Sequence, residues 1–153
     1  MKPAALIGVL ILAACNNPPF GVIDPAQIVG DTIPIALTQD QTDAARGEIV
    51  FSDRNQGHCV LCHAVADLDV PFQGNIGPDL SLVGRRLTPA QLRLRIVDYQ
   101  IIVPGALMPS YFRNHDLYQV QNDFLGETIL SAQQVEDLVA YLSALEGDAD
   151  ENG

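Results

Sequence analysis

The segment Cys59-Val60-Leu61-Cys62-His63 restricts what this chain can fold into more than any other feature. Two thiols at this spacing can add across the two vinyl groups of haem, and the adjacent imidazole can reach the iron. A thioredoxin-like redox pair would need a βαβ pattern, and a zinc site would need a second pair of ligands. The sequence has neither an alternating strand pattern nor a cysteine after residue 62. The motif therefore predicts one covalent haem c on Cys59 and Cys62, with His63 as an iron ligand.

A ligating histidine needs its second ring nitrogen fixed, usually by donation to a backbone carbonyl. The segment Gly77-Pro78-Asp79-Leu80 can turn the chain close to the haem edge and present the carbonyl of Pro78 to His63. Taken in isolation, an ordinary Gly-Pro turn would explain the same residues. After a haem motif, we expect Pro78 to be the backbone partner of His63.

Met108 is the only methionine after the first residue, and flanking prolines keep its segment outside any helix. A lone methionine is more often core filler than a ligand. A proline-flanked loop downstream of a haem motif favours the ligand, so we expect Met108 on the sixth iron position. His115 is the alternative, and it would make a bis-histidine haem of lower potential. His58 is too close to Cys59 to cross to the other face of the ring.

The first 14 residues are typical of a lipoprotein-type signal peptide. Lys2 supplies a positive charge, and the apolar run that follows is too short to span a bilayer. The run ends in Leu12-Ala13-Ala14-Cys15, which resembles the lipobox of bacterial lipoproteins and implies lipid on Cys15. Otherwise Cys15 is an ordinary residue of a signal that is cut elsewhere. We expect a periplasmic protein tethered to the membrane through Cys15, or else a soluble periplasmic one.

The length of 153 residues and the 48% hydrophobic content suit one domain with a tail or two. Prolines and glycines without helical periodicity predict a tether or extended segment over residues 15–39. We place the folded domain at residues 40–147 and an acidic C-terminal tail at 148–153.

Three helices are expected within the domain. Asp43 can cap a helix over residues 43–51, in which Gly47 would allow the last helix to approach closely. Thr88 and Gln91 form one capping box, and Ser131 and Gln134 form another, followed by apolar residues at helical spacing. We expect Gly147 to end the last helix. The pattern predicts an all-α domain whose helices wrap around the haem.

The formal net charge of −11 repels nucleic acid and favours partners that present a basic face. We therefore expect no nucleic-acid partner. The arginines after the haem motif can be a solvated face with ion pairs, or a contact for a haem propionate or an acidic partner. They are Arg85, Arg86, Arg93 and Arg95.

The chain resembles the class I cytochromes c and, more narrowly, the SoxX family of mono-haem subunits of the sulfur-oxidation complex SoxAX. The resemblance covers about residues 43–145. It rests on residues 72–80 (FQGNIGPDL), 95–98 (RIVD), 108–111 (MPSY) and 130–142 (LSAQQVEDLVAYL). Leu82 stands where the family commonly has glycine.

This resemblance implies a heterodimer with a SoxA-like haem subunit. That partner would couple thiosulfate oxidatively to a carrier-protein cysteine, the L-cysteine S-thiosulfotransferase reaction. The present chain would accept the electrons and pass them to a downstream cytochrome c, as a non-catalytic subunit; whether it counts as an enzyme stays open. The alternatives are a free-standing periplasmic shuttle to a terminal oxidase and a haem peroxidase with a displaceable sixth ligand.

Overall fold

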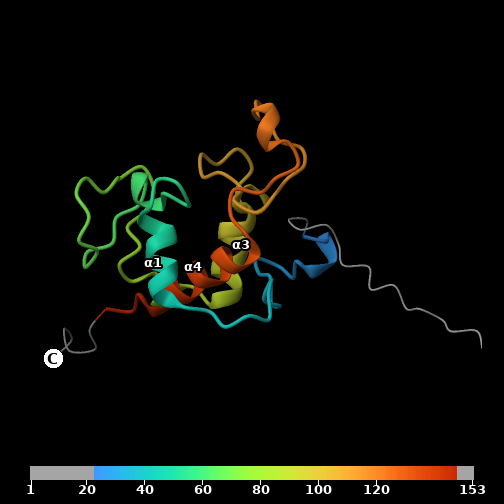
Figure 1. Ribbon diagram of the computed structural model, residues 1–153. Coiled ribbons are helices and arrows are strands. Elements are labelled where there is room, and N and C mark those ends of the chain that lie inside the picture. The colour runs from blue at the N-terminus through green and yellow to red at the C-terminus, as the bar shows by residue number, and fades with distance from the viewer. Residues whose placement is uncertain (1–22, 148–153) are drawn as a thin grey trace, which may run out of the picture.

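The computed structural model describes residues 23–147, so the expected signal peptide, Cys15 and the acidic tail lie outside the described part. In chain order its elements are η1 (Pro25–Gln27), α1 (Ala44–Ser52), η2 (Cys59–Leu61), α2 (Val83–Arg86), α3 (Pro89–Asp98), η3 (Tyr99–Ile101), η4 (Asn122–Phe124) and α4 (Ala132–Ala144). The described residues form no strand beyond one isolated bridge between Val29 and Thr32. The all-α prediction is confirmed. Long loops join α1 to α2 and α3 to α4 (Figure 1).

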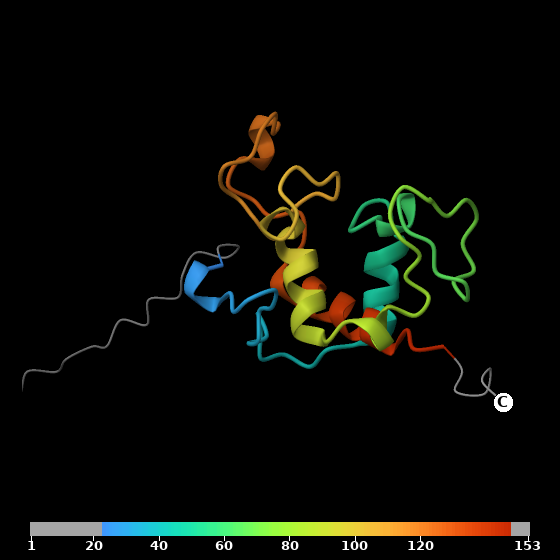
Figure 2. The same ribbon diagram turned by 180° about the vertical axis from the view of Figure 1, so that it is seen from behind.

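Residues 31–37, which we expected to belong to a spacer, lie against the helical domain. Ile33 is completely buried, and its N–H donates to the carbonyl of Ala90 at 3.0 Å. Leu37 N–H donates to Oε1 of Glu136 on α4 at 2.9 Å. The segment passes α3 and α4 before it enters α1 (Figure 2). An apolar side chain and two backbone donors therefore bind part of this segment to the domain.

All three predicted helix starts are confirmed. Asp43 caps α1 and accepts the N–H of Ala45 at 2.8 Å. Each of the other two helices starts with a complete capping box, in which a hydroxyl and a glutamine amide satisfy two backbone donors reciprocally. The boxes are those of Thr88 with Gln91 and Ser131 with Gln134.

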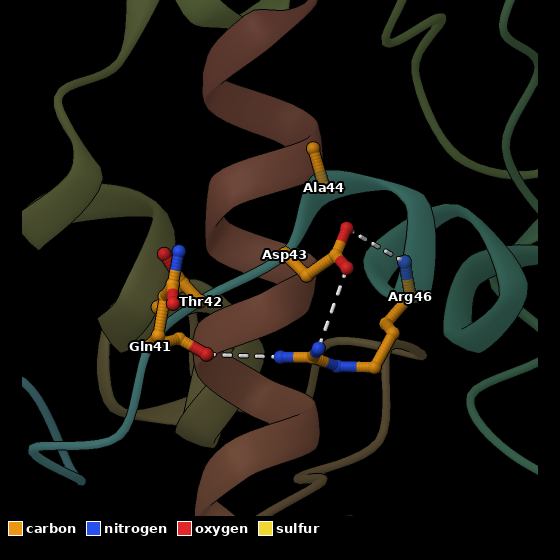
Figure 3. Close-up of a pocket in the computed structure, with 5 residues that line it drawn as sticks. All are labelled: Gln41, Thr42, Asp43, Ala44 and Arg46. Atoms are coloured by element: carbon orange, nitrogen blue, oxygen red, sulfur yellow. Dashed lines mark hydrogen bonds and ion pairs between the residues drawn. The ribbon is translucent and has the colours of Figure 1, made fainter.

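A polar hollow lies at the start of α1 (Figure 3). Its lining consists of Gln41, Thr42, Asp43, Ala44 and Arg46. Arg46 closes it by donating to the carbonyl of Gln41 at 2.9 Å and to Oδ2 of Asp43 at 3.3 Å. No residue of the Cys59–His63 segment contributes to this hollow. It belongs to the capping of a helix rather than to a haem site.

The prediction that Gly147 ends the last helix was wrong, because α4 ends at Ala144. Leu145 turns out of the helix, and its carbonyl accepts the N–H of Gly84 on α2 at 3.0 Å. Gly147 does adopt a left-handed conformation, with φ of +66°, but beyond the helix end. A tertiary hydrogen bond to α2 therefore decides where α4 stops.

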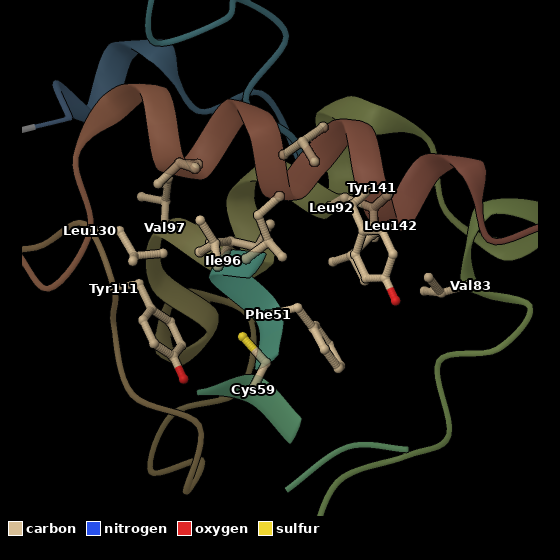
Figure 4. Close-up of a cluster of buried hydrophobic side chains, with 14 of the residues drawn as sticks. Phe51, Cys59, Val83, Leu92, Ile96, Val97, Tyr111, Leu130, Tyr141 and Leu142 are labelled. Atoms are coloured by element: carbon tan, nitrogen blue, oxygen red, sulfur yellow. The ribbon is translucent and has the colours of Figure 1, made fainter. Parts of the chain in front are cut away.

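The predicted close approach of the first and last helices is confirmed at Gly47. A Cβ added there would overlap the carbonyl oxygen of Asp137 and the Cβ of Tyr141. Beside this crossing, the rings of Phe51 and Tyr141 pack with centroids 5.6 Å apart. Helix α3 contributes Ile96 and Val97 to the same core, which borders Cys59 (Figure 4). The core thus joins α1, α3 and α4 directly to the cysteine motif.

One ion pair is buried inside this frame. Arg93 on α3 donates from Nε to Oε1 of Glu136 on α4 at 2.7 Å, and from Nη1 to the carbonyl of Ile33 at 2.7 Å. Both side chains are less than a tenth exposed. Each nitrogen of the Arg93 guanidinium has a hydrogen-bond acceptor. The ion pair therefore fixes the positions of α3, α4 and the N-terminal segment relative to one another.

Candidate haem centre

The paired cysteines and the histidine lie on one tight turn. The turn starts at His58, whose φ of 47° is left-handed, and continues through η2. The N–H groups of Cys62 and His63 both donate to the carbonyl of Cys59, each at 3.0 Å. Cys59 is buried and Cys62 is partly exposed. Local hydrogen bonds therefore bring the three residues of the predicted site together.

The loop over residues 72–80 runs closely alongside this turn. A Cβ on Gly74 would overlap the carbonyl oxygen of Leu61, and one on Gly77 would overlap the ring of His63. Only glycine at these positions allows the 72–80 loop and the Cys59–His63 turn to lie this close together. Three backbone hydrogen bonds hold them together: Gly74 N to Val60 O (2.9 Å), Gly77 N to Cys62 O (2.8 Å) and Leu80 N to Ala64 O (2.9 Å).

The contact that the sequence predicted for His63 is present in this loop. Nδ1 of His63 lies 2.8 Å from the carbonyl oxygen of Pro78. A carbonyl can only accept, so the proton of the neutral imidazole must sit on Nδ1. The lone pair is then on Nε2, which is the arrangement that an iron ligand needs.

The surroundings of Cys59 disfavour the reactive thiolate form of its side chain. Burial raises the pKa of its thiol to about 12. The thiol also forms a side-chain hydrogen bond with the hydroxyl of Tyr111, which lies beside it in the core (Figure 4). A redox pair or a nucleophile needs a thiolate near neutral pH. The raised pKa keeps the free thiol of Cys59 protonated near neutral pH, which argues against a nucleophilic role for Cys59.

Met108 lies in the loop between η3 and η4, outside any helix as its sequence predicts. It is partly buried and packs against the hydrophobic core. His115, the alternative ligand, is exposed on the long segment that leads to η4. These placements favour Met108, but its role as a ligand stays a prediction.

The residues present fit a haem c group. Cys59 and Cys62 can supply the two thioether links, Nε2 of His63 is available to the iron, and the thioether of Met108 is the predicted second ligand. Gly77 lets the 72–80 loop lie against the ring of His63, and Gly74 lets it lie against the backbone of Leu61. Ile76 and Leu107, which lie next to Gly77 and Met108, are 69% and 88% exposed and can pack against an apolar macrocycle.

The four arginines after the motif do not form one surface. Arg93 is buried with Glu136, while Arg95 pairs with Asp31 at 3.2 Å. Arg86 donates to the carbonyl of Asp79 and Arg85 to that of Gly147. The ion-pair interpretation therefore holds for Arg93 and Arg95, but the burial of Arg93 was missed. No local pattern signals it, because its partner is 43 residues away.

Comparison with known proteins places the chain in a family. Residues 44–146 match the family model for cytochrome c, which covers all four α-helices and the Cys59–His63 turn. The chain belongs to the cytochrome c family. The cytochrome carries covalently bound haem c. None of the curated proteins compared with it is a match.

Among solved structures, the cytochrome is similar to the crystal structure of SoxXA from P. pantotrophus. The two chains share 32% identity with a TM-score of 0.71, over 77% of this chain and 92% of that one. It is a SoxX-like cytochrome. The c-type cytochrome SorU from Sinorhizobium meliloti also matches, with 21% identity and a TM-score of 0.45, over 69% of this chain and 92% of that one.

Proposed function

We propose that this cytochrome is the haem-bearing electron-transfer subunit of a SoxXA-type complex. The observation that carries the proposal is the similarity to SoxXA over 92% of that chain. In this assignment Cys59 and Cys62 form the thioether links. Nε2 of His63 and the sulfur of Met108 would bind the iron.

The residues of the chain would tune and enclose this centre. Haem supplies a reversible one-electron couple when it is bound. The carbonyl of Pro78 orients His63 and increases the basicity of its Nε2. A thioether opposite an imidazole raises the reduction potential, which suits an electron acceptor. With Met108 in place no iron position is open to a substrate, so this chain transfers electrons without making bonds.

The partner would be a SoxA-like haem subunit that performs the bond-making step. Joining a carrier cysteine thiolate to thiosulfate forms one S–S bond and releases two electrons. One haem would hold one electron at a time, so the two electrons would leave this chain singly, each to a downstream cytochrome c. The net charge of −11 favours an acceptor with a basic face.

We place the complex in the periplasm, with Cys15 as the lipid anchor. Within residues 23–147 no helix is long and apolar enough to cross a membrane. Mass spectrometry of the mature chain tests the anchor. A lipidated Cys15 at the N-terminus supports it, and a chain cut elsewhere without lipid contradicts it.

Co-purification tests the partner. We expect the native cytochrome to elute with a second haem-containing subunit, and thiosulfate plus carrier to reduce the haem only in the complex. A monomer that receives electrons without such a subunit would contradict the proposal and support the free-standing shuttle.

Replacing the distal ligand tests the site. We expect Met108→Ala to abolish the methionine-to-iron charge-transfer band of the oxidised protein and to lower its reduction potential, because a neutral sulfur ligand is lost. His115→Ala is the control and should keep the band. A wild-type spectrum without this band, or one that changes readily with peroxide, would overturn the assignment of Met108 and favour the peroxidase alternative.

A further inference from the structure

A buried carboxylate at the end of α3 bonds to the loop that carries Met108. Asp98 is 3% exposed. Its Oδ1 accepts the hydroxyl of Ser110 at 2.5 Å and the N–H of Gln100 at 3.1 Å. Its Oδ2 accepts Nη1 of Arg113 at 2.7 Å. One carboxylate thus joins α3 to the residues that follow Met108.

The same network reaches the chain before Met108. Arg113 donates from Nη2 to Oε1 of Gln100 at 3.3 Å, and Gln100 donates from Nε2 to the carbonyl of Ala106 at 3.3 Å. The network therefore contacts the loop at Ala106 and Ser110, two residues to either side of Met108. The contacts at Ala106 and at Ser110 both depend on the position of Asp98.

Packing holds this loop at few points. Leu107 is 88% exposed and Pro109 is also exposed, while Met108 is partly buried. Beyond Ser110 the chain is fixed to α3 again, where Tyr111 N–H donates to the carbonyl of Ile96 at 3.3 Å. Besides the packing of Met108 on the core and the turn hydrogen bond from Ala106 N–H to the carbonyl of Val103, the polar network is what holds the chain between η3 and Tyr111.

We infer that Asp98 is a positioning residue for the distal ligand, because it holds both ends of the loop that presents Met108. This inference rests on the proposed function, in which Met108 is an iron ligand. Asp98 then sets how readily Met108 yields the sixth position to an external ligand. When the network is intact, the loop favours rebinding of Met108 to the iron. When the network is broken, an added ligand competes more effectively for the sixth position.

The substitution Asp98→Asn removes one arm and preserves the shape of the side chain. The amide oxygen can still accept from Ser110, but the amide NH₂ faces Nη1 of Arg113, which is also a donor. The charge-assisted hydrogen bond to Arg113 is lost, and the guanidinium loses its carboxylate. Ser110→Ala is a milder variant that removes only the hydroxyl contact.

Imidazole added to the oxidised haem protein tests the inference. It displaces methionine, and the loss of the charge-transfer band reports the displacement. We expect Asp98→Asn to raise the apparent affinity for imidazole about tenfold, which corresponds to about 1.4 kcal/mol. Ser110→Ala should shift the affinity in the same direction by less, and it keeps the test valid if Asp98→Asn does not fold.

Asp137→Asn is a matched control for general destabilisation. Asp137 is 2% exposed and, like Asp98, it accepts from an arginine, here Nε of Arg46 at 2.7 Å. Its partners lie at the α1–α4 contact and not on the Met108 loop. The control should unfold more easily than wild type with unchanged imidazole affinity. Equal shifts in the Asp98 and Asp137 variants, or no shift in either Asp98→Asn or Ser110→Ala, would overturn the inference.

The proposed function and the positioning role of Asp98 would be contradicted by different results. If wild-type protein lacks the charge-transfer band, Met108 is not the ligand and the site assignment fails. If wild type has the band and the Asp98 and Ser110 variants bind imidazole as wild type does, only the positioning role fails.

Discussion

His63 is held by a neighbouring group that can only accept a hydrogen bond. The carbonyl of Pro78 fixes the tautomer of the ring, and Gly77 allows the backbone to lie against it. Both residues come from a single turn about 15 residues after the histidine, the separation of the His63–Pro78 contact. The chemistry of the proximal ligand therefore depends on a glycine that contributes no functional group of its own.

We expect Gly77→Ala to lower the haem content of the purified protein, because its Cβ would overlap the His63 ring and displace the imidazole. Haem per chain, measured by absorbance against protein mass, checks this result. Asn75→Ala is the control, since Asn75 is an exposed residue of the same loop. Full haem loading in Gly77→Ala would show that the ring can move without loss.

Asp137 should make stability depend on acid. Burial raises the pKa of this carboxyl, but hydrogen bonds from Arg46, Asp43 N–H and Gln133 outweigh burial and hold its pKa below the ordinary 3.8. The ionised form is therefore favoured in the folded state. Its contribution is complete above pH 3.8 and is lost as the pH falls through the lowered, folded-state pKa.

Urea unfolding of wild type and Asp137→Asn as a function of pH tests this dependence. We expect wild type to be more stable at neutral pH and the gap between the two proteins to shrink as the carboxyl is protonated. A gap that stays constant through the acid range would mean that the charge of Asp137 does not contribute.

The contact between α1 and α4 is the tightest helix packing in the described structure. Gly47 faces the backbone of Asp137, so the two helices touch without side chains between them at this point. Phe51, one turn further along α1, packs on Tyr141 and borders the core that contains Cys59. The α1–α4 contact therefore borders the core that contains Cys59.

We expect Gly47→Ala to lower the free energy of unfolding by about 1–3 kcal/mol, because the added methyl would push the helices apart. Helix propensity alone predicts the opposite sign, a gain of about 1 kcal/mol. Denaturant unfolding decides between them. Ala45→Gly on the exposed side of α1 is the control and should cost about 1 kcal/mol through propensity.

The whole molecule is strongly acidic, and its negative charge should govern its association with redox partners. There is no lysine or arginine from Asn114 to Gly153. The field of the protein then attracts a basic acceptor and repels an acidic one over about a Debye length, ~10 Å at 0.1 M salt.

We expect the second-order rate of electron transfer to a basic cytochrome c to fall severalfold between low salt and about 0.15 M salt, because ions screen the attraction. Stopped-flow measurements of haem reduction across a salt series check this result. An acidic acceptor should show the reverse trend. A rate independent of salt with both acceptors would mean that charge does not steer the encounter.

Features that depend on neighbours in the chain could be predicted from the sequence. The haem motif, the capping residues and the Gly77-Pro78 turn act over a few residues or within one loop, so their spacing is visible in the sequence. The approach at Gly47 was also predicted, because a glycine inside an amphipathic helix indicates a close contact. Met108 could be placed in a loop from its prolines, although its ligand role stays a prediction.

Tertiary structure decided the contacts between distant residues. Leu37 and Glu136 are 99 residues apart, Arg93 and Glu136 are 43 apart, and Asp98 and Arg113 are 15 apart across an irregular loop. No periodicity links such pairs, because buried polar groups choose partners by where the helices bring them and not by spacing. The end of α4 was likewise set by the hydrogen bond between Leu145 and Gly84. The class of cofactor can thus be predicted from five consecutive residues, Cys59 to His63. The restraint on the Met108 loop exists only once α3 has folded beneath it.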